Sequence, residues 1–131
     1  PPARTSNSVS IWPASSSESL TAGAALLRRL LRTGSGPDPA LEAHLDLVLA
    51  KPPQASADFS THDFYYWSFG ARALAGVKGA GADRWRTALA RTLQALQVGS
   101  GKPAAGSFDP NDPWGEDEGR VGTTAHAVLA W

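Results

Sequence analysis

Residues 62–74 of the chain read HDFYYWSFGARAL, and this stretch decides the fold class. Its aromatic half, residues 64–69, has the composition of a β-strand. The continuation through residues 70–75 is rich in alanine and leucine, which favours a helix instead. We therefore predict a helix from about Thr61 to Val77.

Two further helices are predicted before this stretch. The serines at 15–17 are favourable N-caps for the first, which ends near Gly34. Its predicted buried stripe has helical spacing and consists of Leu20, Ala24, Leu27 and Leu31, with Leu26 and Leu30 widening it. The second begins with Asp38 as N-cap and Pro39 in the first turn, and it ends before Pro52.

Two more helices are predicted after it. Asp83 is the expected N-cap of one, whose buried stripe consists of Trp85, Leu89, Leu93 and Leu96. The other spans Arg120 to Trp131, after a long loop over residues 98–119. No strand pattern is found, so the predicted class is all-α, with about five helices.

Composition excludes several classes of protein. The 131 residues carry twelve basic and twelve acidic side chains, whereas a protein that binds nucleic acid through phosphates has a basic surplus. The absence of cysteine excludes disulfides, thiolate zinc sites and cysteine nucleophiles. No apolar run is long enough for a transmembrane segment. Nothing in the sequence assigns a compartment.

The predicted domain organisation is simple. Residues 1–10 are polar and lack periodicity, so we expect a flexible N-terminal arm. Residues 11–131 form the helical domain. Because the sequence contains no methionine, we expect this domain to be part of a larger protein.

A short phrase recurs in alternate helices, at Thr21–Leu27, Ser68–Leu74 and Thr123–Leu129. Each copy opens with a hydroxyl residue, has glycine or alanine two positions later and closes with leucine. Small residues that recur on alternate helices favour close packing of those helices in a stacked or ring-like array. The alternative is that alanine-rich helices align by composition alone.

These segments together resemble the bacterial prenyltransferase/squalene-oxidase-repeat proteins. Residues 62–74 are similar to that family's DYYYWYYGTxAL segment, and residues 106–115, after Gln97, to its GSWDP…WG loop, with Phe108 in place of the usual tryptophan. That loop is a relative of the QW motif of terpenoid cyclases. Residues 119–129 and 19–31 resemble the family's GRVYSTALAVL and TAxxLLxRLxL segments. The resemblance implies an α/α toroid in which the first, third and fifth helices are inner.

Five helices cannot close such a ring. We therefore expect either a segment of a larger toroid or an open arc. An open arc has an apolar flank that another domain of the same protein, a protein partner or a second copy of the chain would cover.

The catalytic residues of the fold are missing from this chain. Squalene-cyclase-type catalysis uses an Asp-x-Asp-Asp phrase, and the zinc and thioester chemistries of related toroids use a cysteine; the sequence has neither. We expect no catalytic residue and no cofactor. The predicted function is a non-catalytic binding or protein-interaction module. The alternative is a segment of an isoprenoid-handling or metal-dependent toroid enzyme whose catalytic acids lie elsewhere.

Candidate site residues lie on the predicted inner helices. The ligand-binding candidates in the ring interior are Asp63, Tyr65, Tyr66, Arg120 and His126. Histidine and carboxylate suit zinc, which makes His62, Asp63 and His126 weak metal candidates. In the structural alternative, Asp63 stabilises a helix N-terminus and the tyrosines pack in the core. The acidic loop at 109–118 fails the calcium-loop pattern and is expected to be solvated and to pair with Arg120.

Overall fold

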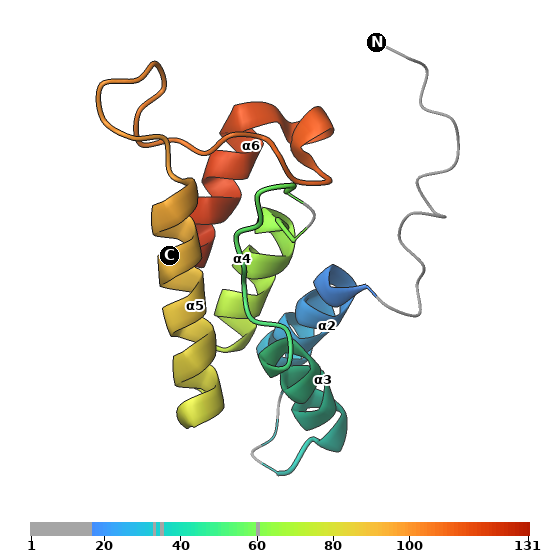
Figure 1. The fold of residues 1–131 in the computed structure, drawn as a ribbon. Coiled ribbons are helices and arrows are strands. Elements are labelled where there is room, and N and C mark those ends of the chain that lie inside the picture. The colour runs from blue at the N-terminus through green and yellow to red at the C-terminus, as the bar shows by residue number, and fades with distance from the viewer. Residues whose placement is uncertain (1–16, 33, 35, 60) are drawn as a thin grey trace.

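The structure is a computed structural model that describes residues 17–32, 34, 36–59 and 61–131. The predicted N-terminal arm lies outside these residues. Within them the chain forms helices and no strand, with one isolated β-bridge between Gln97 and Phe108. The helices are α2 (Glu18–Leu31), α3 (Pro39–Leu49), α4 (Phe64–Ala73), α5 (Ala80–Leu96) and α6 (Gly115–Ala130) (Figure 1). The all-α class is confirmed.

Three of these helices begin at side-chain caps, two of which, Ser17 and Asp38, the sequence predicts, while the third, Asp63, is the structural alternative for that residue. Ser17 Oγ accepts a hydrogen bond from the Leu20 amide at 3.2 Å, and Asp38 Oδ1 accepts one from the Leu41 amide at 3.0 Å. Asp63 Oδ1 accepts one from the Tyr66 amide at 2.7 Å, so α4 begins later than predicted. Each carboxylate or hydroxyl satisfies an amide that has no partner within its own helix.

The predicted cap of α5 is wrong. The helix begins at Ala80 after Gly79, whose φ of 116° favours glycine. Asp83 instead lies in the first helical turn, where its carboxylate is 2.8 Å from the Arg86 guanidinium. At the other end of the chain, α6 contains a break at Gly119 (φ 60°, ψ −171°), so the regular helix starts at Arg120 as predicted.

Alternate helices lie next to each other. Helix α4 packs against both α2 and α6, and Figure 1 shows it between them, while α3 packs on α2 and touches α5. This adjacency agrees with the repeated phrase in α2, α4 and α6. The arrangement as part of an α/α toroid stays a prediction. No helix of the described residues is both long and apolar enough to cross a bilayer.

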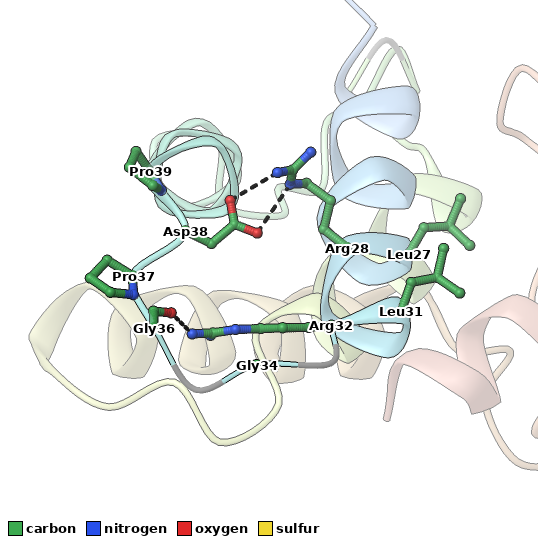
Figure 2. Close-up of a pocket in the computed structure, with 9 residues that line it drawn as sticks. All are labelled: Leu27, Arg28, Leu31, Arg32, Gly34, Gly36, Pro37, Asp38 and Pro39. Carbon is green, nitrogen blue, oxygen red and sulfur yellow. Dashed lines mark hydrogen bonds and ion pairs between the residues drawn. The ribbon is translucent and has the colours of Figure 1, made fainter.

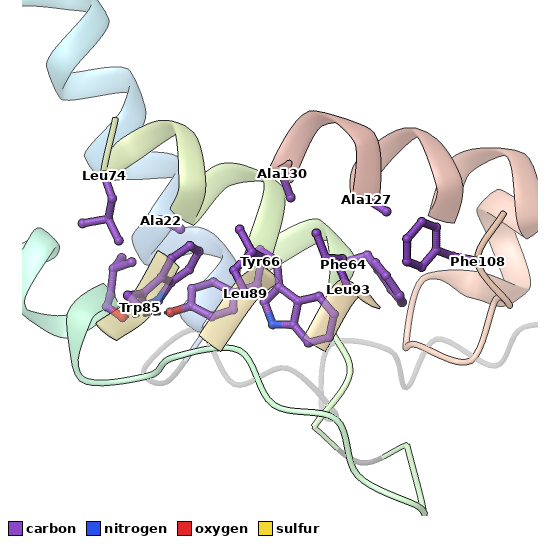
Figure 3. Packing of buried hydrophobic residues seen from close by; sticks show 12 residues of the cluster. Ala22, Phe64, Tyr66, Leu74, Trp85, Leu89, Leu93, Phe108, Ala127 and Ala130 are labelled. Atoms are coloured by element: carbon purple, nitrogen blue, oxygen red, sulfur yellow. Dashed lines mark hydrogen bonds between the residues drawn. The ribbon is translucent and has the colours of Figure 1, made fainter. Parts of the chain in front are cut away.

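The core lies between α4 and α5 and extends to α6 (Figure 3). Trp67 and Trp85 are its largest fully buried side chains. Gly70 lets α5 approach, since a Cβ at this position would lie 2.8 Å from Cζ2 of Trp85. The predicted α5 stripe is confirmed for Trp85, Leu89 and Leu93.

The predicted buried stripe of α2 is wrong except at Leu26, which is buried. Leu20, Leu27 and Leu31 are all more than half exposed. The buried face of the helix consists of Ser19, Ala22, Ala25 and Leu26. Small side chains allow the backbones of α2 and α4 to approach closely, so the face with less hydrophobic surface meets the neighbouring helix. Helix α2 therefore has two apolar faces, of which one is open to solvent.

Candidate functional site

Asp63 connects α2 to the start of α4. Its Oδ1 caps α4, and its Oδ2 accepts a 2.8 Å hydrogen bond from the hydroxyl of Ser19, on the buried face of α2. Burial raises the pKa of Asp63 to about 6, against the opposing effect of hydrogen bonds from the Tyr66 amide and the Ser19 and Trp114 side chains. The nearby Asp112 carboxylate raises it further. This side chain therefore titrates close to neutral pH.

Asp112 brings the loop before α6 to the same place. Its Oδ2 accepts a 3.1 Å hydrogen bond from the Phe64 amide. Asp63 and Asp112, from distant segments, thus each accept a hydrogen bond from a backbone amide in the first turn of α4. Burial is the main cause that raises the pKa of Asp112. The expectation that the acidic loop is solvated is wrong for this residue and for the half-buried Glu118.

The side chain of His126, on α6, lies between Ser68 of α4 and Glu118 at the start of α6. Its Nδ1 is 3.0 Å from Ser68 Oγ, and its Nε2 is 3.2 Å from Glu118 Oε2. Serine, histidine and glutamate are the components of a hydrolase triad. Ser68, however, is only 2 % exposed and its hydroxyl donates to the Tyr65 carbonyl. The arrangement therefore ties α4 to α6 and has no accessible nucleophile.

The two candidate tyrosines have different surroundings. Tyr66 is buried, and its hydroxyl lies 2.8 Å from the Lys51 carbonyl and 3.1 Å from that of Val48, which ties α4 to the end of α3. Tyr65 is half-buried, with its ring centroid 5.0 Å from that of Trp114 and 5.1 Å from that of His126. Tyr66 is thus a core residue, whereas Tyr65 keeps one part exposed.

Arg120 lies apart from Asp63. Its guanidinium pairs with Asp109 and donates to Ser107 Oγ at 3.0 Å. The predicted pairing of Arg120 with the acidic loop is confirmed. These contacts tie the loop to the start of the regular part of α6.

The weak metal candidates do not meet as a metal site. His62 is 3 % exposed, and its Nε2 accepts a hydrogen bond from the Ser56 amide, while burial lowers its pKa. His126 is engaged with Ser68 and Glu118 instead. Across the described part of the chain, no three His, Cys, Asp or Glu residues are placed to hold a metal ion.

A cleft of about 370 Å³ opens beside Asp63. Its walls include Glu18, Lys51, His62 and Tyr66, and the Lys51 ammonium lies 3.7 Å from the Glu18 carboxylate. A larger hollow of about 620 Å³ lies at the turn between α2 and α3, away from every candidate residue (Figure 2). Arg28 and Asp38 form an ion pair there, with Nη2 and Oδ1 separated by 3.0 Å.

Sequence reasoning missed Ser19, Asp112 and Glu118 as members of the candidate site. Ser19 precedes the repeated phrase of α2, and Asp112 lies in a loop that has no periodicity. No local pattern distinguishes these residues from solvated polar residues. Only the packing of α2 and α6 on α4 brings them to Asp63 and His126.

Comparison of the chain with protein-family models, with curated proteins and with solved structures finds no match in any of the three.

Proposed function

We propose that the chain is a non-catalytic protein-interaction module. The observation that carries this proposal is the apolar outer surface of the two end helices of the α2–α4–α6 layer. On α6, Val121 is 84 % exposed, and Val128, Leu129 and Trp131 are also more than half exposed. A helix face of this kind is suited to contact with another protein.

The state of the polar candidate residues supports the same proposal. Asp63 caps α4, Tyr66 and Arg120 bond to neighbouring segments, and His126 is held between two side chains. A catalytic group needs an open position toward its substrate. These side chains are instead engaged in contacts that hold the fold together.

Photo-crosslinking from α6 tests the proposal. A photoreactive phenylalanine analogue replaces Val128 in the protein inside its own cells, and the same analogue at exposed Arg91 of α5 is the control. We expect discrete adducts from position 128 and none of the same mass from position 91. Equal adducts from both positions, or none from 128, would contradict the proposal.

The alternative function is a segment of an isoprenoid-handling enzyme. The observation in its favour is Asp63, a half-buried carboxyl with a pKa of about 6 beside a cleft whose walls include Tyr66 and Trp67. A partly protonated carboxylic acid is a potential proton donor. Titration with a soluble prenyl diphosphate, followed by tryptophan fluorescence, separates the two functions. We expect no saturable change, and a saturable change that Asp63→Asn abolishes would favour the enzyme.

A further inference from the structure

The exposed face of α2 has the spacing of a helix–helix seam. Leu20, Ala24, Leu27 and Leu31 follow one another at intervals of four, three and four residues. This alternation keeps an apolar stripe against a partner helix over several turns. All three leucines are more than half exposed, so the residues that the structure describes do not cover the seam.

The seam has a large half and a small half. Leu27 and Leu31 project from α2 on the side away from Asp38 and help to line the hollow shown in Figure 2. At Gly23, no atom of the described residues lies within 4 Å of the place that a Cβ would occupy. Glycine is unfavourable inside a helix, and no neighbour among the described residues requires it here. Gly23 and Ala24 therefore form a gap that a leucine of a partner helix fits.

A second copy of α2 fills this gap when the two helices run antiparallel. A two-fold axis between Ala24 and Leu27 places Leu27 of each copy over Ala24 of the other. The same axis pairs Leu20 with Leu31. Large residues then face small ones at the centre, and leucine faces leucine at both ends.

Charge favours the same orientation. Glu18 lies at the start of α2, whereas Arg28 and Arg29 are in its last turn and Arg32 follows it. Within the chain Glu18 already pairs with Lys51 and Arg28 with Asp38, so Arg29 and Arg32 leave the end of α2 net basic. Antiparallel packing keeps the two basic ends apart and opposes the two helix dipoles. Parallel packing would place the arginines of the two copies side by side.

We propose that α2 forms the interface of a homodimer, packed antiparallel against α2 of a second copy of the chain. Four leucines of α2 are more than half exposed and offer an apolar centre for the interface, and stable complexes of this kind bury about 800 Å² per partner. This inference rests on the proposed interaction function and names one partner; it assigns α2 to self-association and leaves the α6 face to other proteins.

Analytical ultracentrifugation of the 131-residue chain tests the dimer. We expect a species of twice the 13.7 kDa chain mass at micromolar concentrations. Leu27→Glu should weaken the dimer at least about 100-fold, since a charge at the centre of the seam is desolvated on binding. Leu47→Glu is the matched control, because Leu47 is an equally exposed leucine on α3. A monomeric wild-type chain at about 100 μM, or equal weakening by both variants, would overturn the proposal.

The orientation is tested by disulfide cross-linking, for which the cysteine-free sequence is well suited. Leu20→Cys and Leu31→Cys are prepared separately and then mixed under oxidising conditions. We expect a disulfide between the two variants and little within either alone. Efficient homodisulfides in each variant alone would indicate parallel helices and overturn the two-fold model. Photo-crosslinking from Val128 does not depend on these results, so the interaction function and the α2 dimer can fail separately.

Discussion

Asp63 sets a pH dependence because folding moves its carboxyl out of water. Its pKa rises from 3.8 to about 6, so the folded chain holds the proton more tightly than the unfolded chain. The stability that this provides is fully present below pH 3.8 and is lost as the pH rises through 6. At pH 7 the cost of the charged carboxylate reaches about 3 kcal/mol.

We predict that Asp63→Asn reduces this cost. The asparagine carbonyl can still accept the Tyr66 amide, so the cap of α4 is kept while the charge is removed. The free energy of unfolding of the variant should exceed that of wild type by more at pH 7 than at pH 4.5. Urea denaturation at both pH values measures the difference, with Asp46→Asn on the exposed side of α3 as control. An equal difference at the two pH values would contradict the prediction. His62, whose pKa is lowered, makes stability change with pH in the opposite direction. Its contribution is the same in wild type and variant, so it cancels in the comparison.

At the scale of the element, Gly70 controls how closely α4 and α5 pack. An added Cβ would lie 2.8 Å from Cζ2 and 3.1 Å from Cη2 of the buried Trp85. We predict that Gly70→Ala lowers the free energy of unfolding by about 1–3 kcal/mol despite the better helix propensity of alanine. Gly81→Ala, where the nearest atom is 3.8 Å away, should be neutral or slightly stabilising. Thermal unfolding followed by circular dichroism compares the two, and equal shifts would refute the steric argument.

The break inside α6 is a second element-scale feature that depends on one glycine. Gly119 has φ 60° and ψ −171°, a region that residues with a Cβ avoid. The break lets Oε2 of Glu118 lie 3.2 Å from Nε2 of His126. We predict that Gly119→Ala destabilises the domain by about 1–3 kcal/mol. In NMR spectra, the signals of His126 should also shift, whereas a local effect confined to residues 116–121 would contradict this link.

The element scale also shows what the sequence could and could not predict. Ser17 and Asp38 are identifiable as caps because capping is local chemistry, and Asp63 fits the structural alternative given for it. The buried face of α2 is not identifiable in this way, since two apolar faces compete and the sequence pattern favours the more hydrophobic one. Close approach of α4 instead selects Ala22 and Ala25. The pairing of Asp63 with Asp112 likewise depends on two segments that are distant along the chain, and no local pattern indicates it.

For the whole molecule, self-association through α2 would couple stability to protein concentration. If the dimer unfolds to separate chains, mass action raises the Tm as concentration increases. For chains of this length we expect the Tm to rise by about 2–4 °C for each tenfold increase in protein concentration. Leu27→Glu should remove the dependence without lowering the Tm of the dilute protein, because Leu27 is exposed in the single chain. Differential scanning calorimetry over two decades of concentration measures both effects. The control Leu47→Glu should keep the wild-type dependence, and a wild-type Tm that is independent of concentration would be incompatible with the α2 dimer.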